Sequence, residues 1–172
     1  MRQPKVPSVS AAAMRKACNL SPHLLGAWWE EALKSHFDYI KATRPFYWHR
    51  FPDSKAAGNL IAEQPADFIV ASPPSGAMLV EAKASAAHDS LRSCLSKNVS
   101  TGQALHHRMW ARAGQESMFI FIGVSKPVVE IWNGKYVADC RASGARLKAD
   151  SEWSGDPAGP GLLEALREVF GE

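Results

Sequence analysis

The feature that most constrains this chain of 172 residues is an unbroken apolar run at residues 118–124, MFIFIGV. The run is short and rich in aromatic and β-branched residues, which favours a strand over a helix. A strand that is apolar at every position must be covered on both faces, and helices usually provide such cover. We therefore predict an α/β fold in which a mixed central β-sheet is flanked by helices.

Three segments have the spacing or the end signals of helices. Ser21 and Pro22 suit an N-cap and a first helical position, and apolar residues recur at helical spacing from there to residue 40. A second helix is predicted over residues 99–113, before Gly114, and a third over residues 161–170. Residues 84–98 are expected to form a loop or a short helix.

Further strands are predicted at residues 46–51, 66–71 and 77–83, with loops at residues 52–64 and 150–161. Residues 128–132 and 135–140 flank Asn133-Gly134, a pair that suits a type I′ turn, and are predicted to form a hairpin.

The length suits a single core, and we expect a flexible basic arm at residues 1–20 followed by a single domain at residues 21–172. No apolar run is long enough to cross a membrane. The three cysteines include no CxxC pair, which favours reduced thiols in a cytoplasmic setting. The acid-free N-terminus is also compatible with an organellar targeting segment.

Basic and acidic residues are segregated along the chain. Three stretches contain several Lys, Arg or His residues and no Asp or Glu: residues 1–29, 39–52 and 90–115. Asp38 lies directly before the second of them. Such segregation suits a polyanionic ligand on one side of the molecule, although charge runs are often only solvated faces. The candidate contacts are Arg15, Lys16, His49, Arg50, Lys55, Lys97, His107, Arg108 and Arg112.

The two strands around the proline-rich turn at residues 72–76 bring charged residues together. If Ala71 faces Ala77 in an antiparallel pair, Asp67 lies directly opposite Glu81. Two carboxylates this close favour a divalent cation such as Mg²⁺ between them, with the Ala82 carbonyl as a further ligand. Lys83 shares a strand face with Glu81 and would orient a water or stabilise transition-state charge.

The alternative interpretation is a surface hairpin with an ordinary cross-strand ion pair, because the pattern D…ExK also occurs by chance. The apolar neighbours Phe68, Val70 and Leu79 favour the catalytic interpretation, since unpaired charge at the edge of a core is costly.

Gln64-Pro65-Ala66-Asp67 followed by Val80-Glu81-Ala82-Lys83 resembles the motif of the PD-(D/E)XK nucleases, with one residue inserted between Pro65 and Asp67. The resemblance spans about residues 21–125 and implies the fold of that superfamily, the restriction-endonuclease-like core. It also implies a Mg²⁺-dependent DNA endonuclease, in which Mn²⁺ substitutes for Mg²⁺.

Two further positions resemble Holliday-junction resolvases. Glu30, four residues after Gly26, matches a Glu that reaches the metal in archaeal-type resolvases, and Gln103 resembles part of a His-Gln motif of RecU-type resolvases, with Gly102 in place of the His. The resemblance implies a homodimer that cuts four-way junctions, with catalytic Glu30, Asp67, Glu81, Lys83 and Gln103, and with metal ligands Glu30, Asp67, Glu81 and Ala82.

Two other functions are compatible with the same residues. One is a restriction-like or repair endonuclease that acts on duplex or single-stranded DNA, and the other is a DNA-binding module of the same fold without catalysis. The resemblance favours a nucleoid-associated cytoplasmic protein from a phage or a bacterium, without contact to membranes.

Overall fold

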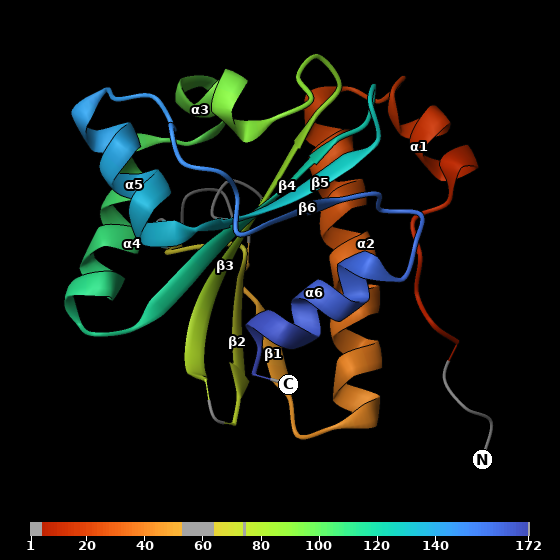
Figure 1. The fold of residues 1–172 in the computed structure, drawn as a ribbon, viewed down its shortest axis with the longest axis horizontal. Helices are drawn as coiled ribbons and strands as arrows, with labels where there is room; N and C mark the ends of the chain where they lie inside the picture. Colours follow the sequence, from red (N-terminus) through yellow and green to blue (C-terminus); the bar gives the residue numbers. More distant parts are fainter. Residues whose placement is uncertain (1–4, 53–63, 74, 172) are drawn as a thin grey trace.

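The structure, a computed structural model, describes residues 5–52, 64–73 and 75–171. Within these residues the chain forms one mixed six-stranded sheet with helices on both faces (Figure 1). The predicted α/β architecture is confirmed at this level.

The strands follow one another across the sheet in sequence order. Only β3 and β4 are parallel, and helices α3 and α4 form the crossover between them. The other neighbouring strands are antiparallel. The strands are β1 (Tyr47–Arg50), β2 (Phe68–Ser72), β3 (Gly76–Ser85), β4 (Glu116–Gly123), β5 (Val128–Asn133) and β6 (Trp153–Gly155).

The helices divide between the two faces of the sheet, with α2 and α6 on one face and α3, α4 and α5 on the other (Figure 1). Each face encloses its own cluster of buried apolar side chains. The helices are α1 (Ala11–Ala17), α2 (Pro22–Thr43), α3 (Leu91–Asn98), α4 (Thr101–Arg112), α5 (Gly134–Ser143) and α6 (Gly161–Val169).

Strand β4 is buried on both faces, as its unbroken apolar sequence predicts. Ile120 and Ile122 enter the larger cluster on the α2 side, while Phe119 and Phe121 enter the smaller cluster on the α4 side. The strand therefore joins the two halves of the core.

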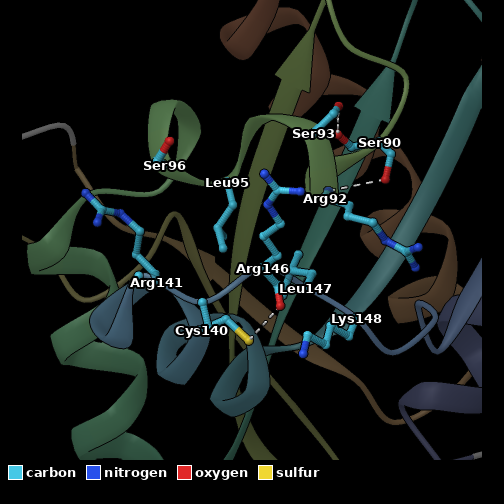
Figure 2. Close-up of a pocket in the computed structure, with 12 residues that line it drawn as sticks. Ser90, Arg92, Ser93, Leu95, Ser96, Cys140, Arg141, Arg146, Leu147 and Lys148 are labelled. Atoms are coloured by element: carbon cyan, nitrogen blue, oxygen red, sulfur yellow. Dashed lines mark hydrogen bonds between the residues drawn. The ribbon is translucent and has the colours of Figure 1, made fainter.

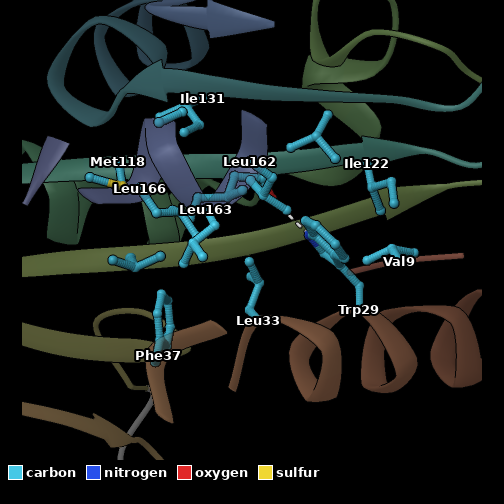
Figure 3. Close-up of a cluster of buried hydrophobic side chains, with 14 of the residues drawn as sticks. Val9, Trp29, Leu33, Phe37, Met118, Ile122, Ile131, Leu162, Leu163 and Leu166 are labelled. Atoms are coloured by element: carbon cyan, nitrogen blue, oxygen red, sulfur yellow. Dashed lines mark hydrogen bonds between the residues drawn. The ribbon is translucent and has the colours of Figure 1, made fainter. Parts of the chain in front are cut away.

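The larger cluster is built mainly from α2, β4 and α6 (Figure 3). Trp29 and Phe37 of α2 are fully buried in it, and the Trp29 indole Nε1 donates a hydrogen bond to the Ile120 carbonyl at 3.0 Å. This bond satisfies the polar atom of a large buried side chain and fixes α2 against the centre of the sheet.

The predicted hairpin over residues 128–140 is wrong in its second half. Residues 128–133 form β5, but the chain then enters helix α5, and the Asn133 side chain accepts a hydrogen bond from the Tyr136 N–H at 3.1 Å. Asn133 is therefore a helix N-cap rather than a turn residue.

Residues 1–20 are predicted to form a flexible arm, but the segment that includes α1 packs against the rest of the fold. Val9, Met14 and Ala17 are buried in the larger cluster, whereas Arg15 and Lys16 are exposed. The predicted loop at residues 150–161 contains the short edge strand β6. Most of the predicted loop at residues 52–64, including Lys55, lies outside the described residues.

In the part of the chain that the structure describes, no helix is both long and apolar enough to cross a membrane.

Candidate active site

Asp67 and Glu81 lie where β2 begins beside the middle of β3. Ala71 faces Ala77 and Phe68 faces Val80, which is the register that the sequence predicts. Asp67 directly precedes β2, and its Oδ2 accepts a hydrogen bond from the Ala82 N–H at 2.8 Å. The two carboxyl groups are close enough for the charge of Glu81 to act on Asp67.

Glu81 is fully buried, and its two carboxylate oxygens have different surroundings. Oε1 forms an ion pair with Lys83 Nζ at 2.6 Å and accepts a hydrogen bond from the Gln103 side-chain amide. Oε2 is buried without a hydrogen-bond partner among the described residues. One oxygen of a buried carboxylate is thus held in place while the other is left to accept a ligand.

The sheet register explains why Glu81, Lys83 and Gln103 meet. Glu81 and Lys83 pair with Phe119 and Phe121 of β4, so they share the face of the sheet that α4 covers. Gln103 lies in the first turn of α4 and reaches down to Glu81.

The position of Gln103 is fixed by a capping box, which was not predicted from the sequence as part of the site. Ser100 Oγ accepts a hydrogen bond from the Gln103 N–H at 3.0 Å, and Gln103 Oε1 accepts one from the Ser100 N–H at 3.0 Å. The S-x-x-Q pattern before an α-helix is the signal that predicts this arrangement.

The electrostatics of the site follow from burial and from the two carboxylates. Burial, together with the charge of Glu81, raises the pKa of Asp67 to about 7, although Lys83 and the Ala82 N–H oppose the rise. Burial disfavours the charged form of Lys83, but the carboxylates of Glu81 and Asp67 outweigh it and raise the pKa of the ammonium group. Lys83 therefore stays cationic at neutral pH.

Glu30 reaches the same region from α2, but it is paired with a basic residue. Its Oε2 lies 2.6 Å from Arg50 Nε, on strand β1. Burial and the charge of Asp67 raise the pKa of Glu30, while Arg50 and Lys83 lower it. Glu30 thus contributes to the electrostatics of the site, and the predicted site residue Arg50 lies beside it.

The donor set fits a hard divalent cation in part. Among the described residues, no group of three or more His, Cys, Asp or Glu side chains converges on one point. Asp67 and Glu81 supply two carboxylates, one with an unpartnered buried oxygen. The N–H and C=O of a strand residue point to the same side, so the Ala82 carbonyl is directed towards Asp67, as its N–H is. Such a set suits Mg²⁺, which keeps several waters of its own.

The residues predicted to contact DNA are not all directed towards Asp67 and Glu81. His49 is exposed on the opposite face of β1 from Arg50, so strand alternation directs only Arg50 towards the site. Arg108 forms an ion pair with Asp139 at 3.1 Å. The exposed candidates are Arg15, Lys16, His49, Lys97 and Arg112.

The prediction that His107 contacts DNA is wrong, because its side chain is fully buried. The imidazole stacks on Phe119 with ring centroids 4.4 Å apart, and burial and the charge of Lys83 lower its pKa to about 3. A buried neutral ring cannot reach a phosphate. Its position one turn after Gln103, on the inward face of α4, explains the burial.

In comparisons with known proteins, no family model, no curated protein and no solved structure matched this chain.

Proposed function

We propose that this protein is a Mg²⁺-dependent endonuclease with a PD-(D/E)XK-type core that hydrolyses phosphodiester bonds in DNA. The observation that carries the proposal is the buried Glu81, which Lys83 and Gln103 hold by one oxygen while the other oxygen has no partner among the described residues. A buried carboxylate oxygen without a partner is costly, and a cation shared with Asp67 would offset that cost.

Each residue has a defined part in this reaction. Asp67 and Glu81 would hold Mg²⁺ together with the Ala82 carbonyl, and Mn²⁺ would substitute for it. The ion would polarise a phosphoryl oxygen and lower the pKa of a water. Lys83, held cationic by its two neighbouring carboxylates, places positive charge where the phosphate gains negative charge.

Gln103 and Glu30 act on the groups around this centre. The Gln103 amide fixes the orientation of the Glu81 carboxylate, and Glu30 fixes the Arg50 guanidinium beside the site. A carboxylate held in one rotamer needs no rearrangement before it binds a ligand, which favours catalysis.

The proposed substrate is a four-way junction, cut by a homodimer, on the basis of the resemblance of Gly26, Glu30 and Gln103 to resolvase positions. Two symmetric cuts need two active sites, which a two-fold dimer supplies. The alternatives are an endonuclease that acts on duplex or single strands, and a module of the same fold that binds DNA without cutting it.

The test is cleavage of a labelled four-way junction, a linear duplex and a single strand, each with Mg²⁺ or with EDTA. We expect paired nicks in the junction that require Mg²⁺ and that fall by at least about 100-fold in Asp67→Asn and Glu81→Gln. Glu31→Gln is the matched control, because Glu31 neighbours Glu30 in sequence but has a 70% exposed side chain.

Each outcome of the test has a defined meaning. Mg²⁺-dependent cutting of only duplex or single strands would retain the nuclease and reject the junction as substrate. Binding of DNA without cutting of any substrate would reject the nuclease and favour the binding module. Equal loss of cutting in Glu31→Gln and Asp67→Asn would reject Asp67 as part of the active site.

A further inference from the structure

A basic cavity of about 770 Å³ lies between α3 and the C-terminal end of α5 (Figure 2). Its volume is in the range of sites that take a small molecule or one unit of a polymer. Its described lining residues do not include the residues of the proposed active site, which are Glu30, Asp67, Glu81, Lys83 and Gln103. The cavity is therefore a separate feature.

Among the described residues, the lining of the cavity carries four cationic side chains and no acidic one. The cations are Arg92 on α3, Arg141 on α5, and Arg146 and Lys148 on the segment that follows α5. Asp150 lies close to Arg92, at 3.3 Å, but its side chain is fully exposed, so this ion pair offsets little of the positive charge. The ligand that complements the cavity is an anion.

Two of the four cations are engaged in holding the walls together. Arg92 Nη2 donates to the Ala149 carbonyl at 2.9 Å, and Arg141 Nε donates to the Val99 carbonyl at 2.6 Å. The other two, Arg146 and Lys148, are exposed, and their side chains make no hydrogen bond or ion pair with the part of the chain that the structure describes. These two are the groups available to a ligand.

The segment that carries Arg146 and Lys148 is fixed in place. Leu147, between them, is buried in the smaller cluster, and the Tyr136 hydroxyl accepts hydrogen bonds from the N–H groups of Lys148 and Ala149 at 2.8 and 3.0 Å. A fixed backbone presents its two cations without a further ordering cost in the main chain, which favours binding.

The cavity lies on the same face of the sheet as the proposed active site. The Arg141–Val99 hydrogen bond joins its wall to the short connection that leads into α4 and Gln103. Exposed Lys97, next to the lining residue Ser96, extends the positive surface along α3. The cavity and the proposed active site therefore lie under the same layer of helices.

We propose that this cavity is a second anchoring site for nucleic acid, in which Arg146 and Lys148 bind a backbone phosphate away from the cleaved bond. The proposal rests on the proposed function for the identity of the polyanion. Arginine and lysine side chains are the usual partners of backbone phosphates, and such contacts position a nucleic acid without reading its sequence.

The test is the binding of a fluorescent four-way junction and a fluorescent duplex in EDTA, over a series of salt concentrations. In Arg146→Ala/Lys148→Ala we expect binding to weaken by roughly tenfold and the slope of log K against log salt to fall by about 2. The charge-retaining Arg146→Lys/Lys148→Arg should restore both. Lys34→Ala/Lys41→Ala, on α2 across the sheet, makes the same change of charge and should leave the slope unchanged.

Three results would overturn the anchoring site: unchanged binding in Arg146→Ala/Lys148→Ala, an equal loss in Lys34→Ala/Lys41→Ala, or wild-type protein that binds neither DNA. Cleavage by the wild type, measured separately with Mg²⁺, distinguishes this failure from failure of the proposed function. DNA that binds through Arg146 and Lys148 but is never cut would retain the anchoring site and reject the nuclease.

Discussion

Asp67 is the residue at which burial and charge oppose ionisation most directly. Its pKa of about 7 arises from burial and from the nearby Glu81 carboxylate. A proton and a divalent cation then compete for the same carboxyl group, because each neutralises it. The protonation of Asp67 should therefore be visible in the stability of the metal-free protein.

We expect Asp67→Asn to stabilise the metal-free protein at pH 8, by up to about 4 kcal/mol, and to have little effect near pH 4. In the unfolded chain an Asp loses its proton near pH 4, whereas folded Asp67 retains it up to about pH 7. Between these values the folded state binds more protons, so the wild type loses stability as the pH rises. Denaturant unfolding in EDTA at a series of pH values measures the difference.

The matched control for this prediction is Glu31→Gln, which makes the same acid-to-amide change at an exposed side chain. A free-energy difference between wild type and Asp67→Asn that stays constant from pH 4 to pH 8 would contradict the raised pKa.

His107 is a buried polar side chain without a hydrogen-bond partner at either ring nitrogen among the described residues. Burial of an unsatisfied polar group costs about 1–3 kcal/mol. We expect His107→Phe to raise the free energy of unfolding by about 1 kcal/mol, since a phenyl ring stacks on Phe119 without that cost. Thermal and denaturant unfolding measure the change.

His107→Ala should lower the free energy of unfolding by about 2 kcal/mol or more, because it leaves a cavity. DNA binding should be unchanged in His107→Phe. A loss of binding with an intact fold would contradict the burial of this residue and restore the phosphate contact predicted from sequence.

Single residues were predictable from sequence where the period of the element decides their direction. On β1, alternation means that His49 and Arg50 cannot both face the site, and Arg50 is the one that does. The adjacent His106 and His107 on α4 could not be assigned in this way. The directions of their side chains depend on which side of α4 packs against the sheet. That docking is a tertiary property that a local pattern does not contain.

At the scale of elements, α4 is linked to the candidate site through Gln103, a side chain that also takes part in the helix cap. Gln103 accepts a hydrogen bond from the Ser100 N–H with its oxygen and donates one to Glu81 with its nitrogen. The two roles use different atoms, so they are separable by substitution.

We expect Gln103→Glu to keep the helix cap, because a Glu at this position also completes a capping box. The new carboxylate would repel Glu81, so Mg²⁺-dependent cleavage should fall by about 10-fold to 100-fold. Ser100→Ala should show the reverse, a loss of about 1 kcal/mol with cleavage largely retained. Unfolding and cleavage assays on both variants measure the two effects.

Equal losses of cleavage in Gln103→Glu and Ser100→Ala would contradict this separation, and would mean that the position of the whole first turn of α4 matters more than the amide of Gln103.

The start of α5 shows why Asn133-Gly134 was misassigned from sequence. In a type I′ turn the glycine is needed for its positive φ, but Gly134 is not among the positive-φ glycines of the structure. It is needed instead because a Cβ there would lie 2.7 Å from backbone atoms of Ser117. The same dipeptide thus begins a helix here, and only the packing of Gly134 against β4 distinguishes this helix start from a type I′ turn.

We expect Gly134→Ala to lower the free energy of unfolding by about 2 kcal/mol or more, because backbone atoms of Ser117 must shift. Gly26→Ala is the matched control, since a methyl group at this position in α2 would have no neighbour within 4 Å and alanine favours helix there. It should raise stability by up to about 1 kcal/mol. Destabilisation by both variants to the same extent would contradict the close approach at Gly134.

At the scale of the whole molecule, the candidate site combines side chains from β1, β3, α2 and α4 with Asp67, which directly precedes β2. The part on β2 and β3 was predictable, because a short turn fixes the register between neighbouring strands. The approach of Glu30 with its partner Arg50, and the layer that α5 forms, depend on long-range packing. Sequence patterns describe the faces of helices but not which neighbour each face meets.

The whole molecule also provides the most direct test of the cation, because a ligand that binds only the folded state stabilises all of it. We expect Mg²⁺ at about 100 times its dissociation constant to raise the free energy of unfolding by about 2.7 kcal/mol at pH 8. The gain should shrink as the pH falls below about 7, where Asp67 retains its proton. Thermal unfolding with Mg²⁺ or EDTA at several pH values measures the gain.

Asp67→Asn and Glu81→Gln should abolish the Mg²⁺ stabilisation, whereas Glu31→Gln should retain it. Because this measurement needs no DNA, it separates a site that binds a cation from a site that cuts. A wild-type protein that gains no stability from Mg²⁺ or Mn²⁺ at pH 8 would contradict the cation site even if the protein bound DNA. The buried Glu81 carboxylate would then be balanced by Lys83 through Oε1, with no cation at the unpartnered Oε2, at the energetic cost that a buried ion pair carries.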